Sequence, residues 1–195
     1  SLISSLRAAL RSGNPSALVI WYDSVTISGS LNYQNCLDDQ NNAYFVVSDG
    51  IFTNYGWWVA QSLLQTSITT AQKDQRSSFD VYTGVDVYAR GTGYQAGYGS
   101  PGNDSVSAAG VCAQAGTSVG LFAPGWTFEQ ASGTGEQHHQ NFEQQDMLFW
   151  IGTGAGYNPG TSKDCIAQYI PERPVPAALP FFTNFDCGRG LLFNV

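Results

Sequence analysis

Hydrophobic residues along the chain fall into short runs that alternate with segments of helical character. The runs, most of which end in polar or aromatic groups, are residues 17–23, 43–52, 80–88 and 118–126. The segments with helical signals between and after them are residues 59–72, 105–116 and 139–151. Strands and helices in this alternation are typical of βα units joined into a parallel sheet, whereas an all-β sandwich needs turns much more often. The sequence therefore predicts an α/β fold.

The segment that opens the chain, SLISSLRAALRSG, lacks the ordered charged, apolar and cleavage regions of a signal peptide and instead predicts an amphipathic helix. Leu2, Leu6 and Leu10 recur on one face, and Arg7 and Arg11 lie outside that face. No apolar run approaches the roughly 20 residues needed to span a bilayer. A membrane is therefore not expected among the partners.

The run 80–88 predicts a strand whose two faces differ. Val81 and Val85 share one face, while Gly84 and Asp86 share the other. A small residue and an acid on one face fit the inside of a barrel, and the polar groups of all four runs gather at the strand ends where a (β/α)₈ barrel builds its active site. Four βα units make half of such a barrel, since a complete one needs about 250 residues.

The chain divides into three parts in this interpretation. Residues 1–170 form half of the barrel, 171–177 form a Pro-rich linker, and 178–195 begin a further domain with a strand that no helix follows. Half a barrel exposes two sheet edges and an open core, so we expect another chain, or residues outside this sequence, to complete it.

Composition favours a neutral, polyhydroxylated ligand. Charged residues make up 12% of the chain and the net charge is −7, against about 25% charged residues in ordinary globular proteins. Ser, Thr, Asn, Gln and Tyr supply the polarity instead, and these groups bind hydroxyls without a large desolvation cost. Nucleic acid is not expected, because phosphate binding needs clustered Lys and Arg.

The sequence gives only weak indications of metal, cofactor or disulfide sites. His139 and Glu143 are spaced i, i+4, but no third ligand has a defined spacing, which favours a solvated helix face over a metal site. No P-loop or nucleophile elbow is present, and no cofactor is expected. The four cysteines could form two disulfides; scattered buried thiols are the preferred interpretation. They are Cys36, Cys112, Cys165 and Cys187.

Aromatic residues at the predicted strand ends are the stronger functional signal. Aromatic faces stack on the C–H faces of sugar rings, and Tyr and Trp add a polar group. Packing in the core explains one or two such residues, whereas five at one end of a sheet predict a sugar-binding cleft. The five are Tyr22, Tyr33, Tyr55, Trp57 and Trp126.

Carboxylates at the same strand ends leave an enzymatic alternative open. A glycosidase commonly uses two carboxyl groups, and an ordinary retaining pair of Asp86 and Glu129 would require a separation of about 5 Å. Each carboxylate alone is better explained as a group that orients its neighbours. The candidates are Asp23, Asp49, Asp86 and Glu129.

Four long motifs, in this order and at these spacings, resemble glycoside hydrolase family 85, the endo-β-N-acetylglucosaminidases that cut the chitobiose core of N-linked glycans. They are LVIWYDSVTISGSLNYQNCLDDQN, DGIFTNYGWW, DVYTGVDVYARG and SVGLFAPGWTFE. The resemblance covers nearly the whole chain and implies barrel strands five to eight. A later segment, ALPFFTNFDCGRG, resembles the strand that opens the β-sandwich after the barrel in that family.

The resemblance implies a substrate-assisted retaining mechanism, in which the sugar's 2-acetamido oxygen forms an oxazoline. A Glu acts as general acid and then base, and an Asn two residues before it orients the acetamido group. This pair is expected upstream of Ser1, on the fourth barrel strand, so no catalytic residue is expected in this chain. The triplet Asn141-Phe142-Glu143 lies on a predicted helix and is not assigned the role.

The resemblance assigns the rest of the cleft to this chain. Tyr22 matches the tyrosine that contacts the acetamido group, Tyr33 stands where the family usually has Trp, and Trp57 matches a tryptophan on the acceptor side. Trp126 and Glu129 match a motif that lines the pocket. Asn54 and Asp86 complete the predicted substrate-binding set, because both lie at strand ends.

The expected partners are an N-glycan or another GlcNAc-containing oligosaccharide, a complementary chain with the first half of the barrel, and a C-terminal β-sandwich segment. The likeness to cytosolic family members favours the cytoplasm and leaves an extracellular location open. The alternative function is a lectin-like or storage protein that binds the glycan on the same fold without cleaving it.

Overall fold

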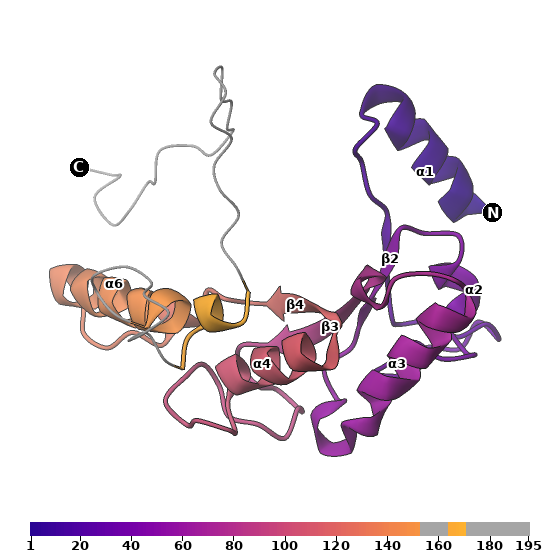
Figure 1. The fold of residues 1–195 in the computed structure, drawn as a ribbon. Helices are drawn as coiled ribbons and strands as arrows, with labels where there is room; N and C mark the ends of the chain where they lie inside the picture. The colour runs from indigo at the N-terminus through magenta and orange to yellow at the C-terminus, as the bar shows by residue number, and fades with distance from the viewer. Residues whose placement is uncertain (153–163, 171–195) are drawn as a thin grey trace.

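The computed structural model of the chain describes residues 1–152 and 164–170 (Figure 1). The predicted linker at 171–177 and the predicted strand within 178–195 lie outside the described residues. The α-helices are α1 (Leu2–Gly13), α2 (Asn42–Phe45), α3 (Ser62–Lys73), α4 (Ser105–Ala115), α5 (Trp126–Glu129) and α6 (Gly135–Ile151). The strands are β1 (Ile20–Tyr22), β2 (Gly50–Thr53), β3 (Val81–Asp86) and β4 (Ser118–Phe122). Short 3₁₀ turns are η1 (Trp58–Ala60), η2 (Ser78–Asp80) and η3 (Ile166–Gln168).

The four strands form one parallel sheet in the order β1-β2-β3-β4. Each strand pairs with the next in sequence, and α3 and α4 make the connections from β2 to β3 and from β3 to β4. Right-handed crossovers that always advance in the same direction place the connecting helices on one face of a sheet. Figure 1 shows α3 and α4 side by side on the same side of the strands. The predicted α/β fold with a parallel sheet is therefore confirmed.

The helix-covered face of the sheet forms the core. Val81 and Val85 on β3 are fully buried, as the sequence pattern predicted. Val81 packs with Ala71 of α3, while Val85 packs with Leu64 of the same helix and Ala108 of α4. Small residues on α3 and α4 let both helices approach the β-branched face of the strand closely, so apolar burial holds this layer together.

All four strands are shorter than the hydrophobic runs that predicted them, and two of the boundaries have a clear cause. The run 43–52 begins as helix α2, and the chain turns before β2 begins, where the hydroxyl of Ser48 lies within hydrogen-bond distance of the carbonyls of Tyr44, Phe45 and Gly50 and can donate its proton to one of them. The run 118–126 leaves the sheet after Phe122, because Ala123 has φ 59° and a proline follows it. Hydrophobicity alone did not mark either boundary.

The predicted N-terminal helix is present as α1, but none of its residues is buried. Arg7 and Arg11 approach Oδ1 of Asp49 at 2.7 and 2.6 Å, and the backbone N–H of Val19 donates to Oδ2 at 2.8 Å. Burial of Asp49 opposes its ionisation, but the Val19 N–H and the two guanidinium groups outweigh this and hold the pKa of the carboxyl below its usual value. One carboxylate thus joins α1 to the start of β1.

Three cysteines are buried free thiols, as the preferred interpretation of the sequence predicted. Burial raises the pKa of Cys36 to about 12, so this residue is a protonated thiol at neutral pH. Cys112 and Cys165 are also fully buried and unpaired. Cys187 lies outside the described residues.

Among the helices of residues 1–152 and 164–170, none has the length and apolar character required to cross a bilayer.

Candidate functional site

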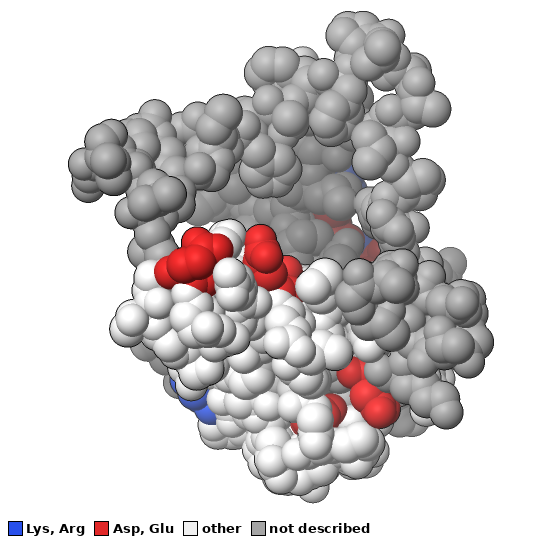
Figure 2. Space-filling view, turned by 90° about the vertical axis from the view of Figure 1, so that its left-hand side faces the viewer, with Lys and Arg blue, Asp and Glu red and all other residues white. Residues whose placement is uncertain are grey.

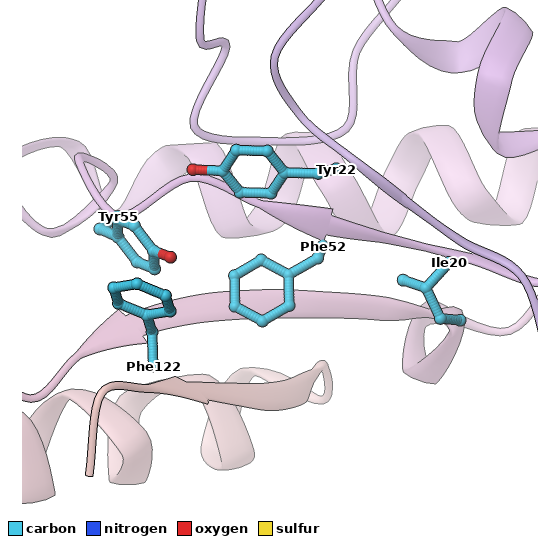
Figure 3. A pocket seen from close by; sticks show the side chains of 5 residues that line it. All are labelled: Ile20, Tyr22, Phe52, Tyr55 and Phe122. Atoms are coloured by element: carbon cyan, nitrogen blue, oxygen red, sulfur yellow. The ribbon is translucent and has the colours of Figure 1, made fainter. Parts of the chain in front are cut away.

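A pocket of about 550 Å³ lies on the face of the sheet opposite α3 and α4 (Figure 3). Alternation of side chains along parallel strands points Ile20 and Tyr22 of β1, Phe52 of β2 and Phe122 of β4 to this face. Tyr55, which follows β2, completes the lining. Four of the five lining residues are aromatic, so the pocket is mostly apolar with hydroxyl groups at two positions.

The rings of the pocket form a continuous row across the sheet. The ring centroids of Tyr22 and Phe52 are 5.8 Å apart, those of Phe52 and Tyr55 are 6.0 Å apart, and those of Tyr55 and Phe122 are 5.4 Å apart. Tyr33 extends the row, with its centroid 6.1 Å from that of Tyr22. Tilted and edge-on contacts at such distances are favourable arrangements of aromatic rings. The row offers a broad, rigid surface on which sugar rings can stack.

Two glycines make room for this row. A Cβ on Gly120 would lie 2.3 Å from Cε2 of Phe52, and a Cβ on Gly84 would lie 2.3 Å from the carbonyl oxygen of Thr53 and 2.8 Å from Cδ1 of Tyr55. Gly84 and Gly120 are paired in register on β3 and β4. The absence of side chains at these paired positions lets the rings lie close to the sheet.

The hydroxyl of Tyr22 donates a hydrogen bond to Oδ1 of Asn54 at 2.9 Å. Desolvation by burial raises the pKa of Tyr22 and, more strongly, that of Tyr55. Both side chains are therefore neutral phenols at physiological pH, and each can exchange hydrogen bonds with a neutral hydroxyl or amide. The predicted positions of Tyr22 and Asn54 at neighbouring strand ends match the structure.

Asp23, an enzymatic candidate in the sequence, is the buried centre of a hydrogen-bond network. Its Oδ1 accepts from Asn41 Nδ2 at 2.9 Å and from the backbone N–H of Gln34 at 3.2 Å. Its Oδ2 accepts from the N–H groups of Asn35 at 2.8 Å and Asn54 at 3.3 Å. Burial raises the pKa of Asp23, although these four donors favour the ionised form. Its oxygens are occupied within the protein, so Asp23 organises the loops rather than reacting.

The carboxylate oxygens of Asp86 are also occupied by hydrogen bonds within the protein. The side chain is buried, and Nε and Nη2 of Arg90 donate to its two oxygens at 2.8 and 3.1 Å. The N–H groups of Tyr88 and Arg90 donate to it as well. A carboxylate that accepts four intramolecular hydrogen bonds is a poor nucleophile, which argues against the open alternative of a retaining pair with Glu129.

Glu129 lies at the exposed end of α5 and accepts a hydrogen bond from the Tyr88 hydroxyl. This contact is the main reason why the pKa of Tyr88 is raised. The guanidinium of Arg90 lies over the rings of Tyr88 and Phe122, 4.9 and 5.6 Å from their centroids. Glu129 and Asp86 therefore belong to a polar cluster beside Phe122, next to the aromatic row rather than within its lining.

Trp57, a predicted substrate-binding residue, is not among the residues that line this pocket. Its side chain is fully buried with Val85 and Leu64, and its indole N–H donates to the carbonyl of Gly84 at 2.8 Å. The neighbouring Trp58 packs against the same cluster. Trp57 is a core residue because the turn after Tyr55 directs it toward the helix-covered face.

Trp126 occupies a separate place at the start of α5. Its ring packs edge-on against Tyr98, with centroids 6.0 Å apart, and it fills the space above Gly97, where a Cβ would lie 2.2 Å from Cη2. The tryptophan is half-buried and packs against the cluster that contains Phe149. The prediction grouped Trp126 with Tyr22, but the structure places it outside the lining of the pocket.

Sequence reasoning missed Phe52 and Phe122 as pocket residues. Their signal is the period-two alternation of β2 and β4, which directs both rings to the same face as Tyr22. Ile20 was missed for the same reason.

On the face seen from the α6 side, the described atoms are mostly uncharged, with several acidic groups among them (Figure 2). Red acidic groups are prominent on this face and blue basic groups are few, in keeping with the net charge of −7. On α6 itself, Nε2 of His139 lies 3.2 Å from Oε1 of Glu143, and both side chains are exposed. Within residues 1–152 and 164–170, no group of three His, Cys, Asp or Glu side chains is arranged to hold a metal ion.

A parallel βα sheet with a row of aromatic rings beside the ends of its strands is typical of glycoside hydrolases. The comparisons with known proteins narrow this class. The chain belongs to glycosyl hydrolase family 85, whose family model matches residues 1–193.

Two curated relatives illustrate the similarity. The chain is 33% identical over 189 residues to cytosolic endo-beta-N-acetylglucosaminidase 2 of Arabidopsis thaliana, a match that covers 96% of this chain and 23% of that protein. It is 35% identical over 185 residues to the cytosolic endo-beta-N-acetylglucosaminidase of Mus musculus, which covers 95% of this chain and 21% of that protein. The chain thus spans a little more than a fifth of the length of these relatives.

A solved structure resembles the fold. The glycoside hydrolase domain of Endo-D from Streptococcus pneumoniae R6 matches with a TM-score of 0.54 and 26% sequence identity. The match covers 83% of this chain and 25% of that chain.

Proposed function

We propose that this chain forms the sugar-binding part of an endo-β-N-acetylglucosaminidase that hydrolyses the chitobiose core of N-glycans. The observation that carries the proposal is the row formed by Tyr33, Tyr22, Phe52, Tyr55 and Phe122 on the open face of the sheet. Such a surface suits the C–H faces of pyranose rings, and the curated relatives at 33% and 35% identity are named as endo-beta-N-acetylglucosaminidases.

The polar groups around the row suit a neutral glycan. Tyr22, Tyr55 and Asn54 offer uncharged hydrogen-bonding groups, while the only nearby cation, among the described residues, is Arg90, which Asp86 neutralises. Tyr33 supplies an exposed ring, and the Tyr88–Glu129 pair supplies polar atoms next to Phe122. In this proposal Tyr33, Tyr88 and Glu129 contact outer parts of the glycan. Trp57 and Trp126 support the site from the core.

The chemistry itself belongs to a segment upstream of Ser1 in this proposal. An Asn-x-Glu pair there acts on the glycan by the substrate-assisted retaining route, and the first half of a (β/α)₈ barrel carries it. The outer edges of β1 and β4 are unpaired within the described part of the chain, and the pocket face lacks a covering helix there, which supports a complementary half. A β-sandwich segment after residue 178 and a cytoplasmic location complete the proposal, the latter supported by the word cytosolic in the relatives' names.

Glycan release tests the proposal. The natural protein that contains this sequence is incubated with a high-mannose glycoprotein, and mass spectrometry measures the residual glycoprotein. We expect a single GlcNAc to remain on each cleaved site. Tyr22→Phe is expected to reduce the rate, whereas Tyr82→Phe makes the same change on the same sheet face, outside the pocket lining, and is expected to leave it unchanged.

Binding of the glycan without release would support the alternative, a lectin-like or storage protein on the same fold. If the protein neither binds nor releases the glycan, the proposal is overturned.

A further inference from the structure

The direction of one hydrogen bond fixes the directions of the next two around Tyr22. The backbone N–H of Gly56 donates to the side-chain oxygen of Asn35 at 2.9 Å. A backbone N–H can only donate, so the atom of Asn35 that faces it is the amide oxygen and not the nitrogen. The orientation of the Asn35 side chain is therefore determined by chemistry.

The side chain of Asn54 is determined by the same oxygen. Its Nδ2 lies 2.7 Å from Oδ1 of Asn35, which is an acceptor, so Asn54 must present its NH₂ group there. The other end of the Asn54 amide is then its oxygen, and that oxygen lies 2.9 Å from the hydroxyl of Tyr22. Tyr22 must donate its only proton to Asn54.

The hydrogen bonds that run from Gly56 through Asn35 and Asn54 to Tyr22 form a relay, and this relay is anchored in the protein interior. Asn35 adopts a left-handed conformation, with φ 59°, and its N–H donates to Oδ2 of the buried Asp23. The N–H of Asn54 donates to the same oxygen. A Cβ on Gly56 would lie 2.8 Å from Oδ1 of Asn35, so only glycine allows the close approach at this position. Both asparagines are thus held by backbone and side chain together.

The consequence concerns the polarity of the pocket. Once the phenolic proton is committed to Asn54, the Tyr22 oxygen can only accept further hydrogen bonds, either from the neighbouring Tyr55 hydroxyl or from a ligand, and the ring of Tyr22 lines the pocket (Figure 3). We propose that Asn54 is a positioning residue that makes Tyr22 a hydrogen-bond acceptor, so that a bound sugar must present an O–H or N–H donor to it. This inference rests on the proposed function, in which the pocket takes a glycan.

A double-mutant cycle tests the inference in the natural protein. The affinity for a high-mannose oligosaccharide that ends in a single GlcNAc, which the proposed activity does not cleave, is measured for wild type, Asn54→Leu, Tyr22→Phe and the double variant. We expect Asn54→Leu to weaken binding by about 3- to 10-fold when Tyr22 is present. In the Tyr22→Phe background, the same change should weaken it by less than about twofold, because a residue that acts only through Tyr22 has nothing left to orient. Asn32→Leu, an exposed position in the same loop region, is the matched control.

Equal losses in both backgrounds would overturn the inference, since Asn54 would then contact the sugar itself or only maintain the fold. If wild type fails to bind the oligosaccharide, the proposed function fails and the relay is judged by NMR. The exchange of the Tyr22 hydroxyl proton with water should be about tenfold faster or more in Asn54→Leu than in wild type. An unchanged exchange rate would overturn the relay.

Discussion

The ring of Phe52 on β2 reaches over β3 and lies above Gly120 on β4, so that a Cβ there would approach Cε2 to 2.3 Å. The floor of the pocket therefore depends on a side chain from one strand and an empty position two strands away. Such a relationship links the aromatic row to the packing of the sheet.

Gly120→Ala is expected to displace the Phe52 ring and to destabilise the protein by about 1–3 kcal/mol, the usual range for overpacking. Gly84→Ala should cost more, because its Cβ would meet the backbone oxygen of Thr53, which cannot move away without loss of β2–β3 pairing. Urea unfolding measures both. Gly125→Ala, where a Cβ meets nothing within 4 Å, should change stability by less than about 0.5 kcal/mol. Equal effects at Gly84 and Gly125 would contradict this account of the floor.

Substitution of Trp57 is expected to lower the stability of the protein, whereas substitution of Tyr33 is expected to weaken glycan binding. Trp57→Ala should cost about 3–5 kcal/mol, because it opens a cavity and leaves the Gly84 carbonyl without its indole donor. Tyr33→Ala, at an exposed position, should leave stability within about 0.5 kcal/mol and weaken N-glycan binding by about 3- to 10-fold. Thermal unfolding and glycan titration of the two variants check the contrast. A Tyr33→Ala protein that binds the glycan like wild type would remove Tyr33 from the site.

Period and composition were sufficient to predict the parallel βα arrangement and the buried valine face of β3, because both depend on side chains that alternate along one strand. They did not separate Trp57 from Tyr55. These residues lie in a turn, where the direction of each side chain depends on local backbone angles and not on a fixed period.

The role of Asp23 could not be predicted from the sequence either. Its four donors come from Gln34, Asn35, Asn41 and Asn54, which are 11 to 31 residues away along the chain. A buried carboxylate without a cation gives no local pattern, since its partners are backbone N–H groups and one amide. The contacts of Asp86 with Arg90 are local by comparison, at i, i+4, and could have been found.

Acidification should weaken the ion pairs by which Asp49 holds Arg7 and Arg11 of α1. The folded-state pKa of Asp49 is lower than its unfolded value of 3.8, so the stability that it supplies is complete above that pH and is lost as the pH falls through the folded-state pKa. We therefore expect wild type to be more stable than Asp49→Asn at neutral pH, and the difference to disappear on acidification below pH 3.8. Urea unfolding as a function of pH, with amide exchange of α1, measures this. Asp39→Asn, an exposed change in the same charge, should show no such difference; a gap between wild type and Asp49→Asn that persists at the lowest pH would refute the assignment.

Asp86→Asn distinguishes the proposed mechanism from a two-carboxylate glycosidase. If Asp86 were a nucleophile, its loss would lower kcat by several orders of magnitude. We expect instead a fall in kcat of less than about a hundredfold, together with a loss of about 1–3 kcal/mol in stability, because the buried amide cannot accept all four hydrogen bonds that the carboxylate receives from Tyr88 and Arg90. Rates of glycan release at saturating substrate, measured in the natural protein below its unfolding temperature, decide between the two. A variant that stays folded and retains less than about one part in ten thousand of the wild-type kcat would assign the chemistry to Asp86 after all.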